Sequence, residues 1–185
     1  MKKSVLIPLI IVVAVIQFFG YIFLIASFLS FLSSSYASKA QKELPEPAIT
    51  YAEFPFKVVY EIDGEQKVLK DTYICEYAGT DFDFASGAHR VWKGYVASNG
   101  NDNIVLISGE LEAVVFDIGS PWYLMDDPLA TTPSRDEFTP KLLLIDYAPG
   151  VGVRRTMTEE KMQEYKIKLI SWELSEPIEN SFGEE

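Results

Sequence analysis

Residues 54–77 read FPFKVVYEIDGEQKVLKDTYICEY, and this stretch decides the fold class. Apolar side chains occupy alternate positions on both sides of Asp63-Gly64, a dipeptide typical of two-residue β-turns. The apolar positions change from even to odd numbers across the turn, as one buried face requires. The stretch therefore predicts a β-hairpin, in which Phe54 lies opposite Tyr73 and Val58 opposite Leu69.

Further strand-like segments follow, separated by clusters of Gly, Asn, Asp and Pro. They are residues 89–97, 104–108, 111–118, 141–147 and 167–174. Short consecutive strands joined by short turns indicate antiparallel pairing. The predicted fold class is mostly β (α+β), built as a sheet, sandwich or partly open barrel.

Two short helices are expected between these strands. Ser120-Pro121 offers an N-cap followed by proline at the first helical position, and Asp127-Pro128 offers a stop. Thr156 and Glu159 have capping-box spacing and predict a helix that ends near Tyr165.

Before the hairpin, the chain has no charged residue between Lys3 and Lys39. The apolar run from Val5 to Leu32 would form a helix of roughly 40 Å, longer than the hydrocarbon core of a bilayer. A transmembrane anchor is the first interpretation. The alternative is a secretory signal peptide cleaved near Ala37, although the apolar run is about twice the usual length of such a segment.

Lys2 and Lys3 lie directly beside the apolar run, so the positive-inside rule predicts a cytoplasmic N-terminus and a domain outside the cell membrane. Residues 1–32 are then the anchor, and residues 33–50 a linker that contains Pro45 and Pro47. Residues 51–185 form the β-rich extracytoplasmic domain.

That domain is strongly acidic. Of the 16 Lys and Arg residues two precede residue 39, and all 27 Asp and Glu residues follow it, giving the rest a formal charge of −13. A surface of this sign repels phosphate backbones, so nucleic acid is excluded as an expected partner.

Four segments carry a resemblance to known proteins: FPFKVVYEIDGE (54–65), DTYICEYAG (71–79), HRVWKGYVASNG (89–100) and KIKLISWELSEPIENSF (166–182). They resemble a family of uncharacterised, membrane-anchored or small proteins of Gram-positive, clostridia-like bacteria. The resemblance implies a source and a location, and it brings no activity and no functional residues.

No catalytic or cofactor motif is recognised. Cys75 and His89 are the only residues of their kinds, but Cys75 lies on the apolar face of its strand, where a thiol is inert. One histidine excludes multi-histidine zinc sites. Oxygen ligands for a hard cation are available at Asp81, Asp83, Asn101 and Asp102, yet these residue types also suit tight turns.

Two candidate contact sites remain. Arg154 and Arg155 precede the predicted second helix and are candidates for anion binding, or they pair with acids of their own domain. Trp122 and Tyr123 are the aromatic residues most expected to be exposed, which suits contact with a glycan.

The leading hypothesis is a membrane-tethered, non-enzymatic domain that binds a partner at the outer face of a bacterial membrane. The lipid bilayer is the first partner, with another membrane protein or cell-wall glycan as further candidates. The alternatives are a cell-wall enzyme that uses carboxylates and a secreted soluble domain.

Overall fold

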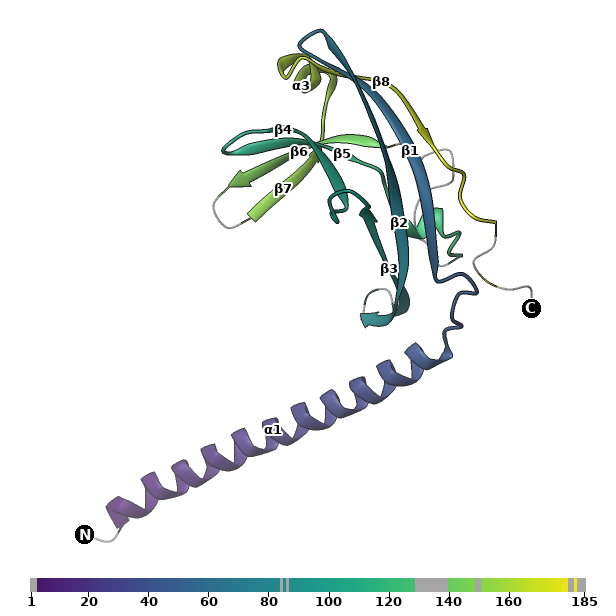
Figure 1. Ribbon diagram of the computed structural model, residues 1–185. Coiled ribbons are helices and arrows are strands. Elements are labelled where there is room, and N and C mark those ends of the chain that lie inside the picture. Colours follow the sequence, from purple (N-terminus) through teal and green to yellow (C-terminus); the bar gives the residue numbers. More distant parts are fainter. Residues whose placement is uncertain are drawn as a thin grey trace. The chain divides into compact units, whose positions relative to one another are not determined.

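A computed structural model describes residues 3–83, 85, 87–128, 140–148, 151–179 and 182. The chain divides into two compact units, one of residues 1–45 with 80–89 and one of residues 46–79 with 90–185. The helices are α1 (Lys3–Glu43), α2 (Pro121–Leu124) and α3 (Glu159–Glu164). The strands, all labelled in Figure 1, are β1 (Tyr51–Ile62), β2 (Glu65–Asp83), β3 (Gly87–Val96), β4 (Asn103–Ser108), β5 (Glu112–Asp117), β6 (Lys141–Ala148), β7 (Val151–Thr156) and β8 (Ile167–Leu174).

The strands form two four-stranded sheets, in the orders β3-β2-β1-β8 and β4-β5-β6-β7. The first sheet is strongly curled, and the second lies on its concave side (Figure 1). This arrangement confirms the predicted mostly β, antiparallel class with an N-terminal helix and short additional helices. It combines two of the predicted architectures, because a partly open barrel wall packs against a second sheet.

The predicted hairpin is confirmed in its register. β1 and β2 are antiparallel, with Phe54 opposite Tyr73 and Val58 opposite Leu69. Asp63 and Gly64 have φ of 51° and 82°, the left-handed conformation that this kind of turn requires.

One apolar core lies between the two sheets of the second unit. It takes alternate residues from β1 and β2 and meets the inward residues of β5, so the period-2 pattern of the sequence becomes one buried layer. Its fully buried members include Phe54, Val58, Tyr73, Cys75, Val114 and Phe116. β5 is buried on both faces, because Ala113 and Val115 join Leu143 and Ile145 of β6 in a second cluster.

The helix α1 passes the predicted anchor end at Leu32 and continues to Glu43, so the expected linker is helical over residues 33–43. The segment contains alanine, lysine, glutamine and glutamate, which favour helix, and the helix ends just before Pro45. Over the described residues, α1 is the one helix long and apolar enough to cross a membrane, and its apolar stretch is not buried by protein. A signal sequence has the same properties.

The second unit differs from expectation around α3. Thr156 ends a strand, β7, that the sequence did not predict, and it therefore does not cap a helix. The N-cap is Thr158, whose hydroxyl accepts a hydrogen bond from the Lys161 backbone N–H at 3.3 Å. The helix ends as expected, with Tyr165 as its C-cap.

Candidate functional site

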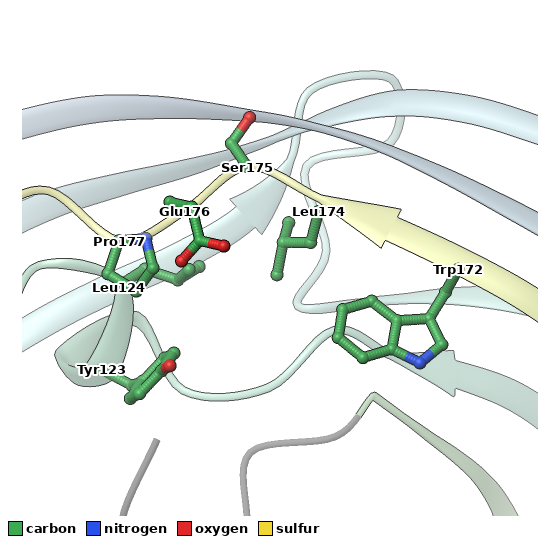
Figure 2. Close-up of a pocket in the computed structure, with 7 residues that line it drawn as sticks. All are labelled: Tyr123, Leu124, Trp172, Leu174, Ser175, Glu176 and Pro177. Atoms are coloured by element: carbon green, nitrogen blue, oxygen red, sulfur yellow. The ribbon is translucent and has the colours of Figure 1, made fainter. Parts of the chain in front are cut away.

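A pocket of about 360 Å³ lies between the end of β8 and the short helix α2. Figure 2 shows the indole ring of Trp172 on one side and the phenol ring of Tyr123 on the other, with Leu174 and the carboxylate of Glu176 between them. The described lining residues are Tyr123, Leu124, Trp172, Leu174, Ser175, Glu176 and Pro177. The pocket therefore combines two aromatic rings with one acidic group.

A β-bulge brings Trp172 to this pocket. In the pairing of β8 with β1, Ser171 lies opposite Val59 and Leu169 opposite Tyr60, so Ile170 is an extra residue. An extra residue reverses which positions face inward. Beyond the bulge Trp172 lies opposite Val58, a core residue, and so it lies on the concave face of the sheet.

The opposite wall, α2, is held by buried residues. Leu124 and Met125 are fully buried in the core. Two residues later, Asp127 accepts a hydrogen bond from the guanidinium group of Arg90 at 2.7 Å and another from the indole N–H of Trp92 at 2.7 Å. These contacts fix α2 against β3, so Tyr123 is presented by a rigid support.

The segment after β8 closes the third side. The backbone N–H of Ser175 donates to the carbonyl oxygen of Pro55 at 3.1 Å, and the Ser175 hydroxyl donates to the same oxygen at 3.2 Å. Further on, the backbone N–H of Ile178 donates to the carbonyl oxygen of Leu124 at 3.1 Å. Hydrogen bonds on both sides of Glu176 thus connect this segment to β1 and to α2.

The two carboxylates of this segment line different surface hollows. Glu173 accepts a hydrogen bond from Lys57 at 2.8 Å, and that bond lowers the pKa of Glu173. Glu176 lines the pocket and is exposed. A carboxylate beside aromatic rings can accept hydrogen bonds from hydroxyl groups while the rings pack against an apolar face.

Of the predicted aromatic pair, Trp122 and Tyr123, one residue lines the pocket. Tyr123 lines the pocket, whereas Trp122 is not among its described lining residues. Both side chains pack against the core and are half-buried, so the expectation that they are exposed is wrong for much of their surface. Trp172, which is 36% exposed, was not predicted as a site residue, because aromatic residues within strands are expected to lie in the core.

Arg154 and Arg155 lie on β7, not at the start of a helix. The guanidinium group of Arg154 donates to Asp102 at 2.7 Å, and this hydrogen bond raises the pKa of Arg154. The structure thus supports pairing of Arg154 with an acid of its own domain, the alternative to anion binding. Arg155 is exposed.

The four oxygen-ligand candidates are divided between the two units. Asp81 and Asp83 lie within β2, and Asp83 lies 3.6 Å from His89. Asn101 and Asp102 lie on the turn between β3 and β4, in the other unit. Within the described residues, no group of three or more His, Cys, Asp or Glu side chains is placed to hold a metal ion.

Cys75 is fully buried on β2, and burial raises its thiol pKa to about 12. At neutral pH the group is therefore a thiol rather than the reactive thiolate. The structure confirms that Cys75 lies in the core.

Comparisons with protein-family models, curated proteins and solved structures find no match to this chain. The resemblance to clostridia-like membrane-anchored proteins thus stays a prediction.

Proposed function

We propose that the chain is a membrane-tethered, non-enzymatic binding domain at the outer face of a bacterial membrane, and that its pocket contacts cell-wall glycan. The observation that carries this proposal is the pocket in which Trp172 and Tyr123 flank Glu176. Sugar rings have apolar faces and hydroxyl edges, which match aromatic rings and a carboxylate.

The membrane part of the proposal rests on α1 and its flanking lysines. A helix of this length that buries none of its described apolar stretch in protein has lipid as its natural surroundings. Tethering would confine the domain to a thin layer beside the membrane and raise its effective concentration for ligands there.

The number of carboxylates in the pocket favours a binding function over a hydrolytic one. Glycoside hydrolases use a pair of carboxylates flanking the scissile bond. Among the described residues that line the pocket, Glu176 is the one acidic group. Its neighbour Glu173 is engaged by Lys57 and lines a different surface hollow.

The test is co-sedimentation of the full-length chain, in detergent, with purified sacculi of a Gram-positive bacterium. Trp172→Ala should weaken binding about tenfold, the effect of losing an anchoring aromatic residue. Tyr147→Ala is the matched control, because Tyr147 is 47% exposed and lies on β6, outside the pocket. Absence of wild-type binding, or equal losses in the two variants, would refute the glycan contact.

A further inference from the structure

A second, more apolar cavity of about 470 Å³ lies where the second sheet meets α3 and the start of β8. This size falls in the range of about 300–1,000 Å³ found for small-molecule sites. The apolar lining residues that the structure describes are Leu142, Met157, Met162, Ile167 and Leu169. Two of the five are methionines, whose flexible side chains adapt to the shape of an apolar ligand.

The walls of this cavity are formed by the core itself. Leu142, Met157 and Ile167 are 5%, 7% and 3% exposed. The backbone N–H of Met157 donates to the carbonyl oxygen of Leu142 at 2.9 Å, which fixes one wall. The cavity therefore extends into the core rather than lying flat on the surface.

Two lysines, one from each sheet, line the cavity. Lys141 begins β6 and lies opposite Asp117, while Lys168 lies on β8 opposite Glu61. Within the part of the chain that the structure describes, neither ammonium group has an ion pair within 4.0 Å. Both lysine side chains are exposed and can reach a ligand.

We infer that this cavity binds a single-chain amphiphile with a carboxylate head, a fatty acid. The acyl chain lies against the methionine and leucine side chains, and the carboxylate lies between Lys141 and Lys168. A neutral amphiphile would lack the charge attraction to the two lysines, and a cationic one would be repelled. Among the described residues, the aromatic pocket and this cavity share no lining residue, so each site can be tested separately.

Glu159 also lines the cavity, and its negative charge repels the carboxylate of the ligand. It is exposed and lies in the first turn of α3, where a carboxylate stabilises the helix. Nearby Lys161 is engaged by Glu164 at 2.7 Å. Among the charged lining residues that the structure describes, the balance is therefore two cations against one anion, in a domain that is otherwise strongly acidic.

The methionines provide the test. The chain has four, and ¹³C-methyl labelling of the full-length chain in zwitterionic nanodiscs reports on each of them by NMR. Titration with dodecanoate should shift the Met157 and Met162 signals saturably. The signal of Met125, which is fully buried outside the cavity lining, should not move.

Charge is tested with dodecyltrimethylammonium, which has the same chain and the opposite head. It should cause no saturable shift at Met157 or Met162. Replacing Lys141 and Lys168 together with methionine should weaken dodecanoate binding about tenfold, whereas Lys93→Met on β3 should leave it unchanged. No dodecanoate shift, an equal response to the cationic probe, or equal effects of the lysine variants would each overturn the proposal.

Discussion

Two arginine–aspartate pairs of the β-rich unit have the same shortest distance but different surroundings. Arg90 and Asp127 approach to 2.7 Å with side-chain exposures of 3% and 1%, and Arg154 and Asp102 approach to 2.7 Å with exposures of 53% and 51%. The chemistry of the contact is the same in the two places. The two pairs differ in burial, and burial decides how much each pair contributes to the stability of the fold.

The buried pair is part of a larger cluster. Trp92 donates a second hydrogen bond to Asp127, and the guanidinium group of Arg90 lies 4.0 Å from the centre of the Phe182 ring. The pair joins β3 to the residues just after α2 and to the C-terminal segment. Charges removed from water must be satisfied by protein, so the cluster has to form as a whole.

The exposed pair joins β7 to the turn between β3 and β4. Arg154 makes two hydrogen bonds to Asp102, at 2.7 Å and 3.4 Å. Water and salt compete with both groups at this exposure, so the attraction is weak. Contact distance alone therefore does not predict how strongly each pair stabilises the fold.

The largest expected effect is that of Asp127→Asn. The variant leaves the buried charge of Arg90 without its carboxylate and should lower the free energy of unfolding by about 3–5 kcal/mol. Urea denaturation of the full-length chain in detergent, followed by tryptophan fluorescence, measures the loss. Glu110→Gln is the control, because it likewise removes one negative charge and Glu110 is exposed, on the turn between β4 and β5. A loss no larger than that of the control would contradict the assignment of Asp127 to a buried ion pair.

A smaller effect is expected from Trp92→Phe. The change keeps a buried aromatic ring and removes the indole N–H that donates to Asp127, so it should cost about 1–3 kcal/mol. The same denaturation experiment measures the loss. Trp172→Phe, at an exposed position in the pocket, should change stability by less than about 0.5 kcal/mol. Equal losses of unfolding free energy in Trp92→Phe and Trp172→Phe would show that the hydrogen bond from the Trp92 indole does not stabilise the fold.

The hairpin of β1 and β2 could be predicted to the residue because two local signals agree. Asp63-Gly64 sets the loop length, and the alternation of apolar residues sets the face. β7 was not predicted, because its sequence contains Gly152, Arg154 and Arg155 and it becomes a strand by pairing with β6. Tertiary pairing there overrides a weak local preference.

The candidate site was predicted only in part, for a similar reason. Tyr123 could be named from its place beside Pro121 at the start of a short helix. Trp172 reaches the pocket through the bulge at Ile170, and a bulge is a property of two paired strands that one strand's sequence does not reveal. The Arg90–Asp127 pair was likewise missed, because it joins residues 37 positions apart in different elements.

The smallest effect is expected from Arg154→Ala, which should lower the free energy of unfolding by at most about 1 kcal/mol. Because both partners are about half exposed, the difference from wild type should shrink further in 1 M NaCl, where the Debye length is about 3 Å. Urea denaturation at low and high salt, with Asp102→Asn and the double variant, isolates the coupling energy of the pair. A coupling energy as large as the loss of unfolding free energy expected for Asp127→Asn would mean that exposure does not determine the strength of the two pairs. A small, salt-sensitive coupling here beside a large loss at Asp127 would attribute the difference to desolvation, because the shortest distance is the same in both pairs.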